Sequence, residues 1–156
     1  LGRSRGGLTT KFHIACNGKG RPLAILVTPG QRHDSTQLEA LPDAIEVPRL
    51  GRGRPRKRPD ELIGDKGYSY PRCRKLLRKR GIRHTIPERR DQREQHSKHR
   101  GRPPRFDKVL YAKRNVAERC VNRLKQWRAI ATRYEKRAVN YRAMIVIASL
   151  MIWLST

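Results

Sequence analysis

The stretch that decides the fold runs from Leu62 to Tyr68 and reads LIGDKGY. Its apolar beginning predicts a short strand that ends at Asp65. We expect a basic helix over residues 70–80 and a second short strand over residues 84–86. Strand, helix and strand in this order are typical of α/β proteins, whose sheets place ligands at the carboxyl ends of their strands. The sequence therefore predicts an acid at the ligand-binding edge of a sheet.

The segments on either side extend the same pattern. Alternating side chains predict a strand over residues 9–16, which a turn joins to a second strand over residues 23–27. Helices are expected over residues 34–48, 107–128 and 138–154. Together these elements predict an α/β fold with one mixed sheet and flanking helices.

The chain is strongly basic. It has 156 residues, of which 38 are Lys or Arg and 13 are Asp or Glu, so its formal net charge is +25. The length indicates one domain, and a hydrophobic content of 36% allows a modest core. A large positive excess is typical of proteins that meet a polyanion, which makes nucleic acid the leading partner. An anionic membrane surface and a structural protein of the ribosomal type are the alternatives.

Neither a membrane span nor a disulfide framework is indicated. The apolar run from Ala143 to Leu154 is shorter than the roughly 18 residues that a bilayer span needs, so it predicts a buried terminal helix. The three cysteines, Cys16, Cys73 and Cys120, are widely separated and contain no C-x-x-C pair. We expect them to be reduced in a cytoplasmic protein.

Two basic loops, at residues 49–60 and 88–106, interrupt the pattern, and each contains the tetrapeptide Arg-Gly-Arg-Pro. This tetrapeptide resembles an AT-hook, whose arginines enter the A·T minor groove. Non-specific contacts to phosphates and a plain solvated linker are the alternatives. The candidate DNA-binding residues in these loops are Arg52, Arg54, Arg56, Lys57, Arg58, Arg100 and Arg102.

The helix expected over residues 107–128 places four polar side chains together. At 3.6 residues per turn, Tyr111, Arg114, Glu118 and Lys125 share a face about 60° wide. The opposite face carries apolar side chains. We expect Trp127 on that face, and Trp153 on the last helix, to lie in the core. The alternative is that the four polar residues are only a solvated face.

Asp65 and Glu118 are the candidate metal ligands. Carboxylates suit Mg²⁺, or Mn²⁺, because these ions prefer oxygen ligands. Two such ions can activate a hydroxyl and stabilise the leaving oxygen in phosphodiester chemistry. The two acids would then hold metal in front of a basic surface.

These residues resemble those of a known family. The spacing Tyr111-x2-Arg114-x3-Glu118-x6-Lys125 matches the Y-(2)-R-(3)-E-(6)-K signature of bacterial insertion-sequence DDE transposases, and LIGDKGY is similar to the segment around their second catalytic aspartate. The resemblance covers nearly all of residues 1–156. It implies an RNase H-like fold and a DNA transposase that cleaves and transfers strands with two divalent ions. Asp65 and Glu118 would be its second and third acids, while Tyr111, Arg114 and Lys125 would hold the transposon end.

The sequence departs from the family pattern at its beginning. The first catalytic aspartate should lie on a strand before the hairpin, yet no Asp or Glu precedes Asp34. We therefore expect the chain to lack the first strand and first acid and to be inactive without an upstream segment, whether it is a fragment, a frameshift product or a decayed remnant.

Next to this site, Asp34 or Ser35 is expected to cap a helix, with an auxiliary active-site role for His33 or Asp34 as the alternative.

The resemblance also implies the partners. They are transposon-end and target DNA in the bacterial nucleoid and further copies of the chain. The alternative function is a non-catalytic DNA-binding remnant or an AT-hook-like architectural module.

Overall fold

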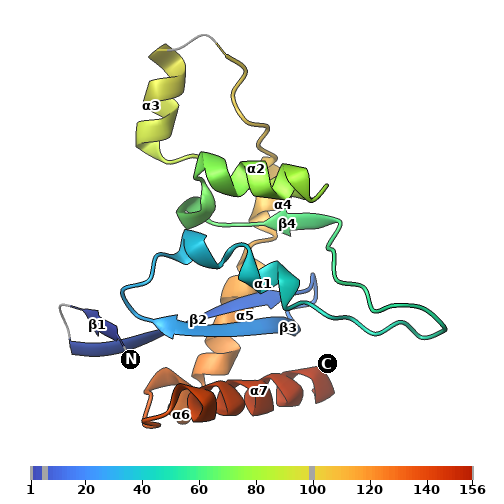
Figure 1. Cartoon of the computed structure of the whole chain (residues 1–156), viewed down its shortest axis with the longest axis vertical. Helices are drawn as coiled ribbons and strands as arrows, with labels where there is room; N and C mark the ends of the chain where they lie inside the picture. Colours follow the sequence, from blue (N-terminus) through green and yellow to red (C-terminus); the bar gives the residue numbers. More distant parts are fainter. Residues whose placement is uncertain (1, 5–6, 99–100, 156) are drawn as a thin grey trace. The chain divides into compact units, whose positions relative to one another are not determined.

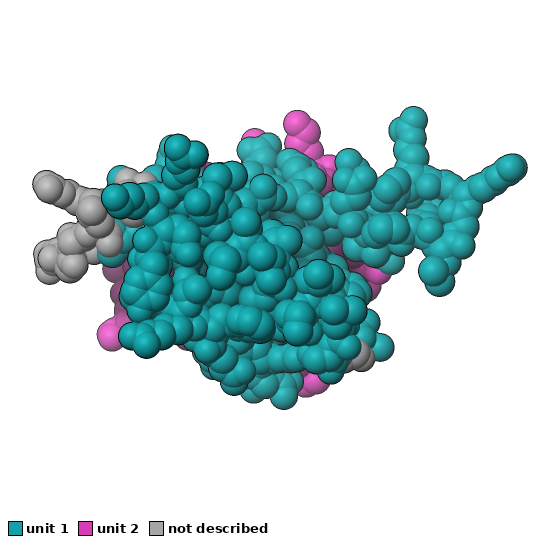
Figure 2. Space-filling model, turned by 90° about the horizontal axis from the view of Figure 1, so that it is seen from below, with its two compact units in different colours: residues 1–58, 115–156 teal, residues 59–114 magenta. Residues whose placement is uncertain are grey.

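A computed structural model describes residues 2–4, 7–98 and 101–155. The chain forms two compact units, which Figure 2 distinguishes by colour. Unit 1 consists of residues 1–58 and 115–156, and unit 2 consists of residues 59–114. Each unit has its own sheet and helices.

Unit 1 is built on an antiparallel sheet with the strand order β1-β2-β3, formed by Gly2–Ser4, Gly7–Cys16 and Pro22–Pro29. The predicted hairpin is confirmed, with Ile14 opposite Ile25. Asn17 closes the turn, because its side-chain oxygen accepts hydrogen bonds from the backbone N–H groups of Lys19 and Arg21, both at 3.0 Å.

Helices cover both faces of this sheet (Figure 1). On one face, Ala24 packs near Leu41 and Ile45, which follow the 3₁₀ helix η1 (Asp34–Gln37). Leu41 lies in the short helix α1 (Ala40–Asp43). The other face, which carries Ile25, packs against α5 (Asn115–Lys125), α6 (Arg128–Ala131) and α7 (Ala138–Leu154).

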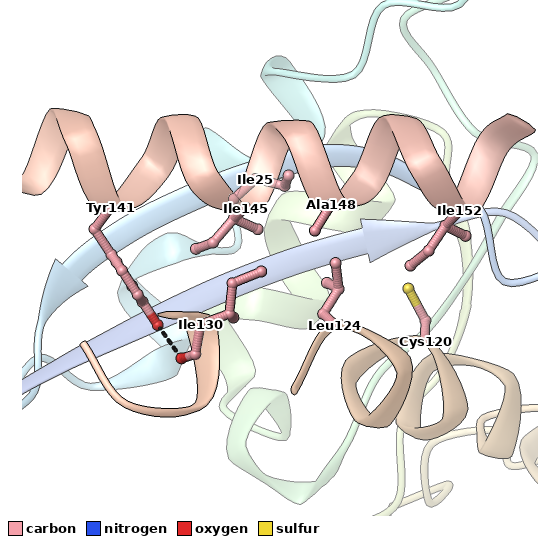
Figure 3. Packing of buried hydrophobic residues seen from close by; sticks show 8 residues of the cluster. All are labelled: Ile25, Cys120, Leu124, Ile130, Tyr141, Ile145, Ala148 and Ile152. Atoms are coloured by element: carbon pink, nitrogen blue, oxygen red, sulfur yellow. Dashed lines mark hydrogen bonds between the residues drawn. The ribbon is translucent and has the colours of Figure 1, made fainter. Parts of the chain in front are cut away.

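The larger core of unit 1 lies between α5, α6, α7 and the sheet (Figure 3). Leu124 and Ile145 are fully buried in it. The ring of Tyr141 is buried as well, and its hydroxyl donates a 2.9 Å hydrogen bond to the carbonyl oxygen of Ile130. This bond gives the buried hydroxyl a partner and ties α7 to α6.

Unit 2 contains both predicted short strands, β4 (Glu61–Ile63) and β5 (Arg83–Thr85), which pair in parallel. They are connected through η2 (Lys66–Tyr68) and α2 (Pro71–Lys79). Gly81 follows α2 with φ 64°, a backbone conformation in which glycine avoids the strain of a side chain. The described part of the unit also forms α3 (Arg90–Lys98) and α4 (Lys108–Ala112).

Several predicted elements are wrong in detail. The strands of the described residues form two separate sheets, one antiparallel and one parallel, instead of one mixed sheet. The helix expected over residues 34–48 is divided into η1 and α1. Pro42 explains the division, because its ring would clash with the carbonyl of Leu38 in a continuous α-helix. The stretch 88–106 is not all loop, since α3 occupies half of it and carries an Arg90–Glu94 ion pair at 2.7 Å.

The helix expected over residues 107–128 is also interrupted, and it forms α4, α5 and the start of α6. At the first break the backbone N–H groups of Lys113 and Arg114 bond to carbonyls three residues earlier, at 3.1 and 2.9 Å. Asn115 then begins α5. The second break leaves Trp127 as the N-cap of α6.

The last helix has the predicted bounds but is buried on one side only. Its buried side contains Tyr141, Ile145, Ala148, Ser149 and Ile152. The other side is exposed and contains Val139, Val146, Ile147, Leu150, Met151 and Leu154. The tryptophan predictions are wrong too, because Trp127 is 42% exposed and Trp153 is 39% exposed. Trp153 is nevertheless anchored, since its indole N–H donates a 2.7 Å hydrogen bond to the Pro22 carbonyl.

Candidate functional site

Asp65 lies just beyond the carboxyl end of β4, as predicted, and is exposed. Its Oδ1 accepts a 2.8 Å hydrogen bond from the backbone N–H of Gly67, so Asp65 caps η2. The Gly64 N–H donates to the Thr85 carbonyl at 3.1 Å, which continues the pairing of β4 with β5 up to the acid. A side chain at Gly64 would place its Cβ 3.3 Å from Ile86 Cγ1, so the chain is closely packed here. The result is an exposed carboxylate held by a well-fixed backbone.

Glu118 lies in the first turn of α5 and is also exposed. The buried side of the same helix carries Cys120 and Leu124, which anchor it in the core of unit 1. An acid in the first turn is favoured by the positive end of the helix dipole, and Lys125 in the last turn is favoured by the negative end. Both charged side chains therefore face solvent on a firmly packed helix.

Tyr111 and Arg114 contact each other in unit 2. The guanidinium of Arg114 lies 5.4 Å from the centre of the Tyr111 ring. The centre of the Phe106 ring lies 5.2 Å from the centre of the same tyrosine ring. The prediction that these residues share one continuous helix face with Glu118 and Lys125 is wrong, because α4 ends at Ala112 and α5 begins at Asn115.

The basic loop at residues 49–60 is largely exposed, and its Arg56 forms an isolated antiparallel bridge with Val47, which precedes the loop. Two backbone hydrogen bonds form this bridge: the Val47 N–H donates to the Arg56 carbonyl at 3.0 Å, and the Arg56 N–H donates to the Val47 carbonyl at 2.8 Å. Lys57 lies 3.9 Å from Glu46, a distance at which an exposed pair contributes little. All five of the predicted DNA-binding side chains of this loop are exposed: Arg52, Arg54, Arg56, Lys57 and Arg58. Of the two in the second loop, Arg102 is exposed and Arg100 lies outside the described residues.

The cap expected at Asp34 or Ser35 is instead made by His33, whose Nδ1 accepts a hydrogen bond from the Ser35 N–H at 3.2 Å. Asp34 forms a 3.1 Å ion pair with Lys11 on β2. Nothing in these contacts tests an auxiliary active-site role for either residue.

A cavity of about 950 Å³ in unit 2 was not foreseen from the sequence. Five arginines contribute to its lining: Arg74, Arg78, Arg83, Arg102 and Arg105. Only Arg102 was expected to bind DNA. The others lie on α2, on β5 and before α4, so their proximity depends on how these elements pack.

The carboxylates of Asp65 and Glu118 are hard oxygen donors, so the donor chemistry fits Mg²⁺ or Mn²⁺. No group of three His, Cys, Asp or Glu side chains gathers as a metal site within residues 2–4, 7–98 and 101–155. In the same ranges, none of the helices has the length and apolar character needed to cross a membrane. All three cysteines are free thiols, as predicted.

These features define a strongly basic α/β protein that exposes carboxylates on fixed backbone elements. The family model described as "Transposase DDE domain" matches residues 2–154. The chain therefore belongs to the DDE transposase family, as the sequence resemblance predicts.

Two curated relatives agree with this assignment. The chain is 34% identical over 154 residues to the protein named as the transposase for insertion sequence element IS402 of Burkholderia cepacia, covering 99% of this chain and 66% of that protein. It is 29% identical over 147 residues to the protein named as the transposase for insertion sequence element IS6501 of Brucella ovis, covering 94% of this chain and 99% of that protein. The chain thus spans just under two thirds of the first relative. No solved structure matches it.

Proposed function

We propose that this chain is the C-terminal portion of an RNase H-like transposase catalytic domain, which cleaves DNA at transposon ends and transfers the strands. The observation that carries the proposal is the exposed, capped carboxylate of Asp65 at the end of β4, in a chain that matches the DDE family along residues 2–154. The Y-(2)-R-(3)-E-(6)-K spacing at Tyr111, Arg114, Glu118 and Lys125 supports the subtype.

Asp65 and Glu118 would hold the divalent ions, which when bound supply charge stabilisation for the phosphodiester reaction. The Gly67 N–H fixes one carboxylate oxygen of Asp65, so that the orientation of this ligand does not have to be acquired when metal binds. Tyr111, Arg114, Lys125 and the exposed arginines of the basic loop would contact the DNA backbone. Arginine and lysine do so because each neutralised phosphate releases counterions.

The first catalytic aspartate and its strand would come from an upstream segment. Support comes from the absence of any Asp or Glu before Asp34, whereas the coverages of the IS402 and IS6501 relatives, 66% and 99%, do not locate such a segment. The 156-residue chain would then be inactive alone and would act in the nucleoid as part of an oligomer on paired DNA ends. Strand cleavage or joining by the purified chain with Mg²⁺ would contradict this part of the proposal.

The competing function is a DNA-binding remnant without catalysis. In a protein completed by the upstream segment, Asp65→Asn and Glu118→Gln should each lower strand cleavage by more than about a hundredfold. Replacing a residue that only hydrogen-bonds to a metal ligand already lowers metal affinity or activity by about 10–100-fold. DNA binding should persist. Glu94→Gln is the matched control, because Glu94 is an exposed acid paired with Arg90 on α3. A completed protein that binds transposon ends but does not cleave them would favour the remnant.

A further inference from the structure

Arg74 on α2 carries a buried guanidinium with unused donors. Its side chain is 6% exposed, and its Nη2 donates a 2.7 Å hydrogen bond to the Ile86 carbonyl. Its Nη1 is buried and has no hydrogen-bond partner among the described residues. Buried charged donors are normally paired, because an unpaired one bears its full desolvation cost. The missing partner of Arg74 is therefore a sign of a ligand.

Arg74 lines two cavities of unit 2. The larger one measures about 950 Å³, the smaller one about 340 Å³, and Arg74, Arg78 and Pro104 contribute to both. The smaller cavity also contains Glu88, which favours the charged form of Arg74, although burial outweighs it and lowers the pKa of Arg74. Glu88 is itself engaged, since its Oε1 lies 2.7 Å from His96 Nδ1.

The charged residues that line the larger cavity favour binding of an anion. The lining contains five arginines and only two acids, Glu61 and Asp107. Asp65 is not among the lining residues, so the cavity does not include the candidate metal ligand. Guanidinium groups bind phosphate through paired N–H donors, and a cluster of them is typical of phosphate recognition.

We propose that Arg74 and Arg78 bind a phosphate group in this cavity. A volume of about 950 Å³ lies in the range of small-molecule sites, about 300–1,000 Å³, so the cavity suits a nucleotide or the end of a single strand. The phosphate would come from a DNA strand end or from a free phosphate ester. Only the first source rests on the proposed transposase function.

The test measures phosphate binding by the whole chain in the absence of divalent metal. Inorganic phosphate is titrated by calorimetry at constant ionic strength, and a short fluorescent oligothymidylate is titrated by anisotropy. Arg78→Gln is the main variant, because Arg78 is exposed and its replacement leaves the core intact. Arg74→Gln is a second variant, checked for folding by circular dichroism. Lys75→Gln is the control, since Lys75 is an exposed cation on the same helix that lines neither cavity.

Arg78→Gln should weaken phosphate binding about tenfold, the value of a charge-assisted hydrogen-bonded contact, and Lys75→Gln should change it less than about twofold. Equal weakening in both variants, or no phosphate binding by the unaltered chain, would overturn the proposal. Displacement of the oligonucleotide by phosphate identifies a strand end as the ligand, whereas phosphate binding without displacement identifies a free ester. This experiment measures no cleavage, so absence of phosphate binding would not contradict the transposase proposal. Loss of cleavage in the Asp65 and Glu118 variants would likewise not contradict phosphate binding by Arg74 and Arg78.

Discussion

Shortening Leu124 to alanine should destabilise unit 1 strongly. Leu124 on α5 is fully buried and belongs to the same cluster as Ile130 and Ile145 (Figure 3). Leu124→Ala removes three carbon groups, and at about 0.8 kcal/mol each the missing burial amounts to about 2.4 kcal/mol. The remaining cavity raises the total into the range of about 2–5 kcal/mol. This is a large share of the roughly 5–15 kcal/mol by which domains are stable.

Tryptophan fluorescence can follow this change in unit 1 alone, because both tryptophans, Trp127 and Trp153, lie in residues 115–156. In urea titrations the midpoint should fall for Leu124→Ala while the slope stays the same. Val146→Ala is the control, since Val146 on α7 is 48% exposed and its truncation should cost less than about 1 kcal/mol. Equal midpoints for the two variants would show that the packing described around Leu124 is wrong.

Three further outcomes are expected. Tyr141→Phe should cost about 1–3 kcal/mol, because it leaves the buried Ile130 carbonyl without its donor, whereas the exposed Tyr134→Phe should cost far less in the same urea titration. Burial lowers the pKa of His13, so unit 1 should lose stability as the pH falls from the ordinary histidine pKa of about 6.5 towards the lower folded value, and His13→Gln should flatten this dependence. Replacing Arg52 and Arg54 by glutamine should reduce the slope of log DNA affinity against log salt by about 0.9 for each phosphate that is no longer neutralised, and an unchanged slope would mark the basic loop as a solvated linker.

The elements that could be predicted are those decided by neighbouring residues. The hairpin of β2 and β3 follows from alternating side chains and from Asn17, which closes the turn through its own side chain. The end of α2 follows from Gly81, and the bounds of α7 follow from an unbroken apolar run. The position of Asp65 follows from the sequence as well, because its strand, its acid and its turn are consecutive.

What could not be predicted depends on contacts between distant residues. No glycine or proline marks the break between α4 and α5, so periodicity alone extended the helix through Lys113 and Arg114. The role of Arg74 was also hidden, because a basic residue on an amphipathic helix is usually solvated. Its hydrogen-bond partner, the Ile86 carbonyl, lies 12 positions further along the chain, and Pro104, which lines the same cavity, lies 30 positions further along.

The one-sided burial of α7 has a practical consequence for preparing this protein. A chain with a net charge of +25 is expected to retain nucleic acid at low ionic strength, and added salt should weaken that binding. Salts that are excluded from protein surfaces also strengthen the association of apolar groups. The uncovered side of α7, which presents Ile147, Leu150 and Leu154, then favours self-association in the same buffer. We therefore expect the basic side chains to set the lowest salt concentration that is useful in purification and the exposed side of α7 to set the highest.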